Sequence, residues 1–204
     1  MSDNSPETAI HNPEADLALI RSMMETGRKR AGIDGSHLVW WGALLSATFF
    51  YQYAAVHGWV PNLRAMPWFF ITAMGWAGSL YFSRKAGRAC AEHNPALTAY
   101  ASAWMAVGVT MIVYMISSVS SGENNPGSAT ILSSGVIGCA FFVMAQVLRL
   151  RPMYLAAAGW WAIMAYTIAA PVIQKELILV LSAASLLFIF VPGLYLKKLA
   201  AGED

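Results

Sequence analysis

The side chains that could bind a metal ion or carry out redox chemistry in this 204-residue chain are four histidines and two cysteines. His37 and His57 are too far apart to share an ion, because about 30 Å separates them along one expected helix. His93 could meet His37 on one face of the membrane, but no HxxxH motif or neighbouring carboxylate completes a ligand set. Cys90 falls in a loop, Cys139 is expected to be buried in the middle of a span, and no CxxC motif exists. We therefore expect no metal ion, haem or other cofactor.

Motifs of the common enzyme classes are also missing. The chain contains no GxSxG, P-loop, HExxH or GxGxxG sequence. The longest connection between the expected spans, residues 83–96, is too short for a catalytic domain. We expect a protein without enzymatic activity, and the alternative is an intramembrane enzyme that uses Ser, Tyr and interfacial His side chains.

A basic amphipathic helix near the N-terminus is the candidate binding element. It is expected within residues 12–35, after a disordered tail over residues 1–11, and it starts at Asn12 and Pro13, a favourable cap and first helical position. It could anchor on the membrane surface or dock on a protein partner. Its apolar stripe and basic end, which would contact lipid or partner, consist of Leu17, Ile20, Met24, Arg28, Lys29 and Arg30.

The composition places most of the remaining chain in a membrane. Hydrophobic residues make up 57% and charged residues 12%, with a mean hydropathy of +0.51, whereas soluble domains carry about 25% charged residues. A membrane-spanning helix needs about 20 apolar residues. Six stretches reach about that length with no charged residue inside, apart from Arg149 at the end of the fourth, and they run over residues 38–56, 65–82, 97–116, 129–150, 153–173 and 177–196.

These stretches predict an all-α, polytopic membrane protein with six transmembrane helices in three hairpins, preceded by the cytoplasmic amphipathic helix. The transmembrane domain is expected over residues 36–198, and residues 199–204 form a short tail. Pro171 and Pro192 are expected near span ends, where a kink is tolerated. Trp41 and Tyr51 share their spacing with Trp104 and Tyr114. A true repeat of the hairpins and a chance likeness of aromatic belts both explain that spacing.

The distribution of basic residues predicts the orientation. Only Arg64 and Lys175 fall on the side that we expect to lie outside the cytoplasm, and the positive-inside rule assigns the basic side to the cytoplasm. Both termini are then cytoplasmic, and the short loops favour a bacterial inner membrane. The basic side carries Arg21, Arg28, Lys29, Arg30, Arg84, Lys85, Arg88, Arg149, Arg151, Lys197 and Lys198.

Within the spans, small residues spaced four apart are the clearest pattern. Such pairs let helices approach closely in lipid, and some of them could serve oligomer contacts. The pairs are Gly42/Ser46, Gly75/Ser79, Ser102/Ala106, Ser134/Gly138 and Ala158/Ala162. Because no ionisable group lies at mid-depth, we expect a non-catalytic accessory or regulatory subunit that acts through the amphipathic helix and helix contacts. The alternative is a channel or transporter for a small neutral or apolar solute, and no nucleic-acid partner is expected.

Overall fold

The computed structural model describes residues 35–63, 66–85, 95–122, 125–170 and 175–201. The chain divides into two units, Met1–Ala31 and Gly32–Asp204. All described residues belong to the second unit, so the predicted amphipathic helix and the N-terminal tail lie outside the described part of the chain.

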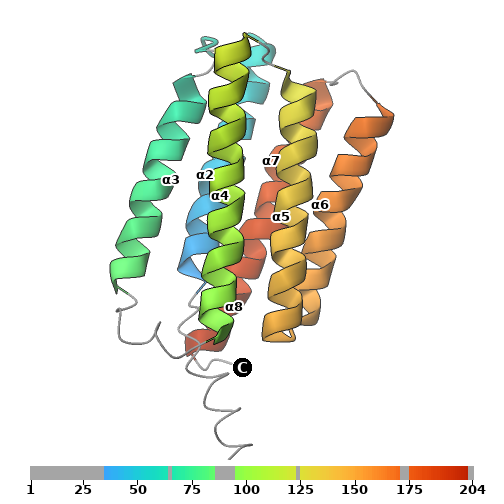
Figure 1. Cartoon of the computed structure of the whole chain (residues 1–204). Coiled ribbons are helices and arrows are strands. Elements are labelled where there is room, and N and C mark those ends of the chain that lie inside the picture. Colours follow the sequence, from blue (N-terminus) through green and yellow to red (C-terminus); the bar gives the residue numbers. More distant parts are fainter. Residues whose placement is uncertain (1–34, 64–65, 86–94, 123–124, 171–174, 202–204) are drawn as a thin grey trace, which may run out of the picture. The chain divides into compact units, whose positions relative to one another are not determined.

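The described residues are helical and contain no strand. Helices lie at all six ranges that the sequence marks as apolar (Figure 1). The predicted all-α class is therefore confirmed. The elements are α2 (Ser36–Val56), α3 (Met66–Lys85), α4 (Pro95–Ser121), α5 (Pro126–Leu148), α6 (Arg151–Ala169), α7 (Lys175–Ser185), the π-helical turn η2 (Leu186–Phe190) and α8 (Val191–Ala201).

Three of the helices in the described segments are long and apolar enough to cross a membrane: Thr98–Ser121, Pro126–Leu148 and Lys175–Ala201. Helices α2, α3 and α6 are of similar length, at 21, 20 and 19 residues. Their tryptophans and tyrosines carry polar N–H and O–H groups, which lower the mean hydropathy although the rings are largely apolar. The membrane character of the protein is confirmed by the three apolar helices.

The last of these helices is continuous from Lys175 to Ala201 and contains a π turn at its centre. The N–H of Val191 donates to the carbonyl of Leu186, five residues earlier. Pro192 follows directly, and a proline ring inside a helix clashes with the carbonyl four residues before it. We attribute the π turn to this clash, since the wider turn moves that carbonyl away. Pro192 lies within this helix, which runs on to Ala201.

The boundaries of two connections follow from local chemistry. The side chain of Asn125 caps α5 by accepting from the N–H groups of Gly127 and Ser128, and Pro126 occupies the first position of the helix. At the other end, Arg149 takes a left-handed conformation with φ 53° and ends α5 at Leu148. Helix α6 then begins at Arg151, and Pro152 at its second position costs no helical hydrogen bond, because the first N–H groups of a helix have no partner within it.

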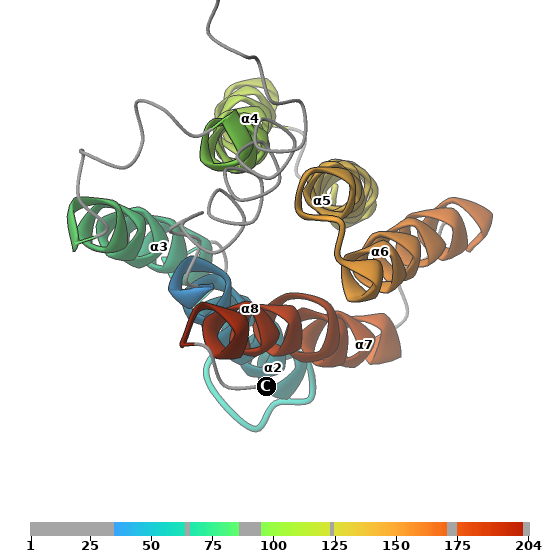
Figure 2. The same ribbon diagram turned by 90° about the horizontal axis from the view of Figure 1, so that it is seen from below.

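Packing is uneven among the helices. The most extensive contacts join α5 to α6 and α2 to the last helix along α7, η2 and α8. Helix α3 packs on α2, and α4 packs on α5 (Figure 2). The buried side chains come mainly from α5, α6 and the last helix, and include Phe141, Met144, Met153, Trp160 and Ile189.

Candidate functional site

A hydrogen-bonded serine pair joins α2 to the last helix. Ser46 is 7% exposed and Ser182 is 5% exposed. The Ser182 hydroxyl donates to the Ser46 carbonyl at 2.9 Å, and the two hydroxyl oxygens lie 3.0 Å apart. Because the Ser182 hydroxyl already donates its proton to the Ser46 carbonyl, the Ser46 hydroxyl must be the donor to Ser182 Oγ. The pair therefore fixes the register between the first described helix and the last.

Other buried hydroxyls bond to their own helix. Thr130, Thr167 and Ser185 donate to the carbonyls four residues earlier, at 2.8 to 2.9 Å. Such local bonds satisfy a hydroxyl without a partner helix, as we expect for most Ser and Thr residues of the spans. Ser46 and Ser182 depart from this pattern, and no sequence signal distinguishes them from the others.

The π turn lies beside the serine pair, and two glycines of neighbouring helices pack closely against it. A side chain at Gly42 of α2 would come within 2.6 Å of the backbone nitrogen of Phe190, and one at Gly159 of α6 within 2.5 Å of the Phe188 ring. Further along, a side chain at Gly193 would lie 2.7 Å from the nitrogen of Val39. Backbone therefore packs against backbone along this interface. We call the α2 contact with α7, η2 and α8 the seam.

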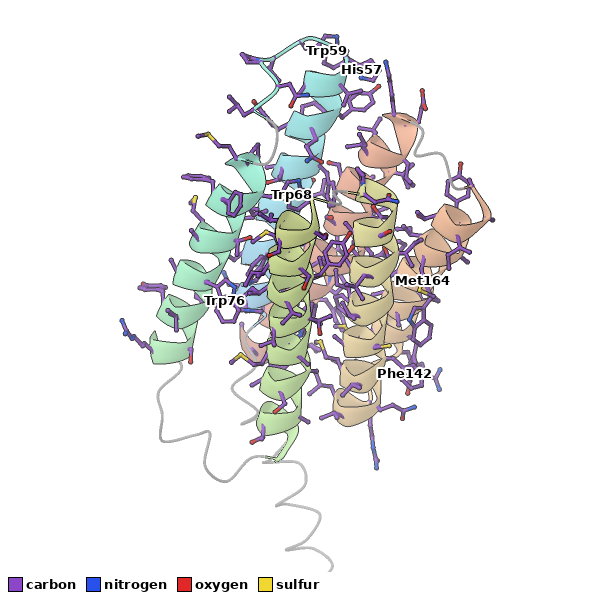
Figure 3. The ribbon with its side chains drawn as sticks, turned by 45° about the horizontal axis from the view of Figure 1, so that its top comes forward. His57, Trp59, Trp68, Trp76, Phe142 and Met164 are labelled. Carbon is purple, nitrogen blue, oxygen red and sulfur yellow. The ribbon has the colours of Figure 1, made fainter. Side chains whose placement is uncertain are left out.

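Two further buried polar groups have no hydrogen-bond partner within the described segments, namely Oγ of Ser134 on α5 and Nε1 of Trp160 on α6. Ser134 is fully buried, and Trp160 is 2% exposed. Gly138 packs on Trp161, and Gly135 on Met164, so the two helices are in close contact here; Met164 is labelled in Figure 3. A donor and a hydroxyl without partners can bind a small polar molecule.

The pairs α2–α3 and α4–α5 are joined by corresponding contacts. Trp41 Nε1 donates to Ser79 Oγ of α3 at 2.9 Å, and Trp104 Nε1 donates to Met144 Sδ of α5 at 3.1 Å. Ten residues after each tryptophan, a tyrosine hydroxyl donates to a backbone carbonyl of the following connection. Tyr51 reaches Pro61, and Tyr114 reaches Asn125. The shared Trp–Tyr spacing of the sequence thus has a shared structural role.

The five pairs of small residues separate into two groups. Gly42/Ser46, Gly75/Ser79 and Ser134/Gly138 face other helices of this chain, against Phe190, Trp41 and Trp161. Ser102/Ala106 on α4 and Ala158/Ala162 on α6 are exposed. The sequence predicts the close approaches but does not tell which pairs are used inside the chain.

The histidines do not form a ligand set in the described part. His37 lies among the rings of Trp41, Tyr100 and Trp104, with centroids 6.1 to 6.4 Å away. His57 stacks near Tyr53 and Trp59 at the opposite end of α2 (Figure 3). Within the described residues, no three His, Cys, Asp or Glu side chains come close enough to hold a metal ion.

Several predicted positions fall outside the described residues. They include His93, Cys90 and the candidate contact residues Leu17, Ile20, Met24, Arg28, Lys29 and Arg30. Cys139 is described, and the expectation that it is buried is wrong. It is exposed in an apolar groove of about 240 Å³ between α4 and α5, which Ala103, Ala106 and Val143 also line.

Compared with known proteins, the chain matches no family model, no curated protein and no solved structure.

Proposed function

We propose that this protein is a non-catalytic accessory or regulatory subunit of a bacterial inner-membrane complex, with six transmembrane helices in three hairpins and both termini in the cytoplasm. Lengths of 19 to 21 residues suit α2, α3 and α6 to a membrane about 30 Å thick. The seam supports a membrane position for α2, because it holds that helix against an apolar spanning helix. Among the described helix ends, Arg84, Arg149, Arg151, Lys197 and Lys198 favour the cytoplasmic side.

One observation carries the accessory role: α4 has no buried residue over its apolar segment Thr98–Ser121. On α2, Gly42 and Ser46 follow Trp41 by one and five positions and are buried against the last helix. The corresponding positions on α4, counted from Trp104, are Met105 and Val109, which are 54% and 50% exposed. The face of α4 that corresponds to the covered face of α2 is therefore open.

Ser102 and Ala106 are also exposed on α4, and Ala106 lines the groove between α4 and α5. Small residues allow a helix of another protein to come close, and packing rather than the hydrophobic effect drives association in lipid. We propose that a transmembrane helix of a partner protein covers this face. The basic amphipathic helix, through Leu17, Ile20, Met24 and Arg28–Arg30, would add a second contact at the cytoplasmic surface.

Purification of the tagged full-length protein from its native membrane in mild detergent tests this proposal. Wild type is expected to retain a stoichiometric partner. The double variant Ser102→Leu/Ala106→Leu is expected to remain folded and to retain at least tenfold less of the partner. Deletion of residues 12–31 is expected to weaken retention as well.

The matched control is Ala73→Leu/Ala77→Leu, which enlarges two exposed alanines four positions apart on α3. Retention of the partner by this control, together with its loss from the α4 variant, supports the proposal. Recovery of wild type as a lone monomer, or equal effects of the two double variants, contradicts it.

A second function is favoured by Ser134 and Trp160, whose buried polar groups have no partner among the described residues and would suit a channel or transporter for a small neutral solute. Flux of glycerol or urea into proteoliposomes measures this activity. The Ser134→Ala and Trp160→Phe variants are expected to slow the flux if the two groups bind solute, and to leave it unchanged if they do not.

A further inference from the structure

A cavity of about 210 Å³ lies where the start of α2 meets the ends of α3 and α8. It is lined by Ser36, Val39, Trp40, Ala43, Phe82 and Lys197. Ser36 and Ala43 are seven residues apart on α2, so the cavity extends about 10 Å along that helix. Its polar lining residues, Ser36 and Lys197, lie at the helix ends, and its inner part is apolar. The cavity is therefore polar at one end and apolar along the rest of its length, which matches an amphiphilic molecule.

The polar end carries positive charge. Lys197 lines the cavity and is exposed. Arg84, two residues beyond Phe82 on α3, is also exposed. A lysine ammonium on its flexible stem binds phosphate as a point charge, and basic side chains near a membrane surface attract anionic lipids.

The apolar wall of the cavity is rigid. Trp40 Nε1 donates to the carbonyl of Met74 on α3 at 3.2 Å. The Trp40 ring lies directly against Gly78, which has no side chain to displace it. A wall that is fixed before binding lowers the entropic cost of ordering a ligand.

We propose that this cavity binds one anionic glycerophospholipid, with its phosphate at Lys197 and one acyl chain along Val39, Ala43 and Phe82. A soluble phosphate would gain nothing from the apolar lining. Lys197 lies four residues from the end of Lys175–Ala201, a helix apolar enough to cross a membrane, and this places its ammonium within reach of the headgroup layer. The inference does not depend on the proposed accessory role.

Native mass spectrometry tests the proposal on the full-length protein released from nanodiscs that contain equal amounts of phosphatidylglycerol and phosphatidylcholine. Wild type is expected to retain one phosphatidylglycerol in preference to phosphatidylcholine. Lys197→Gln is expected to lower that preference about fivefold, since a basic residue near the headgroups contributes about 1 kcal/mol. Lys197→Arg retains it. Lys198→Gln, which removes an adjacent charge outside the cavity, is the matched control and is expected to retain most of it.

A second pair of variants tests the acyl-chain groove. Ala43→Leu fills the cavity and is expected to reduce retention of the lipid at least fivefold. Ala47→Leu enlarges an exposed alanine one turn away that does not line the cavity, and it leaves binding unchanged. Circular dichroism checks that both variants are helical.

Three results would overturn the proposal. Wild type could show no preference between the two lipids. Lys198→Gln could lower the preference as much as Lys197→Gln, which would indicate diffuse surface charge. Ala43→Leu could behave like Ala47→Leu, which would place the lipid elsewhere.

Discussion

Helices α2 and α4 each begin a pair of helices, and in each pair a tryptophan N–H donates to the second helix and a tyrosine hydroxyl donates to the connection, yet the surroundings of the two helices differ. Helix α2 is covered by the last helix, which packs on it through Gly42, Ser46 and the backbone around Gly193. Helix α4 contacts α5 and, through Gly108, the ring of Trp76 on α3, and its apolar segment has no buried residue.

This difference separates two uses of an apolar helix surface. The face of α2 is matched to a partner within the chain, with glycines placed where the partner backbone approaches. The face of α4 carries Met105 and Val109 instead, with small residues beside them. Substitutions in the seam should therefore change the stability of the protein, and substitutions on α4 should mainly change what it associates with.

The largest expected effect is at Gly42. Gly42→Ala places a methyl group about 2.6 Å from the Phe190 backbone, which cannot move as a side chain tip can. Overpacking of this kind costs about 2–3 kcal/mol in the free energy of unfolding, although alanine favours the helix. The measurement is unfolding in mixed SDS micelles followed by circular dichroism.

Met105→Ala on α4 is the matched control for Gly42→Ala, because the two positions correspond relative to Trp41 and Trp104. Met105 is 54% exposed, and its replacement is expected to change the unfolding free energy by less than about 0.5 kcal/mol. If the free energy of unfolding fell by similar amounts in the two variants, the distinction between the seam and the open face of α4 would be wrong.

The next effect concerns how α4 is held. Trp104→Leu removes the bond to Met144 Sδ and the edge-to-face contact with Phe141, whose centroid lies 5.3 Å away. We expect the local stability of α4 to fall by about 1.5 kcal/mol, and hence its backbone amides to exchange hydrogen about tenfold faster. Trp41→Leu is expected to change exchange in α2 less, because the seam holds that helix independently. Equal changes in the two helices would show that α4 has further support.

The positions of the helices were predictable because length and charge decide them. A helix lies at each of the six apolar runs, and turn formers such as Asn125–Pro126 and Arg151–Pro152 lie at the boundaries. The helix ends differ by a few residues from the predicted spans. Local capping, as at Asn125 and Arg149, sets these ends, whereas the apolar pattern does not record it.

Which side of each helix meets another helix was not predictable from this sequence. Lipid tails are as apolar as a protein core, so the pattern of apolar residues does not separate the two environments. Cys139 was expected to be buried and lies exposed beside α4, and the spacing of Ser102/Ala106 resembles that of Gly42/Ser46 although only the latter is covered. The serine pair depends on a contact between residues 136 positions apart, for which a single sequence carries no signal.

The smallest effect that sharpens the comparison is at the serine pair. Ser182→Ala removes the bond to the Ser46 carbonyl and the acceptor for the Ser46 hydroxyl. Interhelical hydrogen bonds in membrane proteins contribute about 0.6 kcal/mol on average and about 1.7 at most, so we expect the free energy of unfolding to fall by about 1 kcal/mol.

Ser120→Ala on α4 is the control, because its hydroxyl donates to the Ile116 carbonyl of the same helix. It is expected to change stability by less than about 0.3 kcal/mol. The Ser46→Ala/Ser182→Ala double variant decides whether the two hydroxyls act together. If they do, the loss of the double variant is smaller than the sum of the two single losses, and strict additivity would show that the two hydroxyls do not interact.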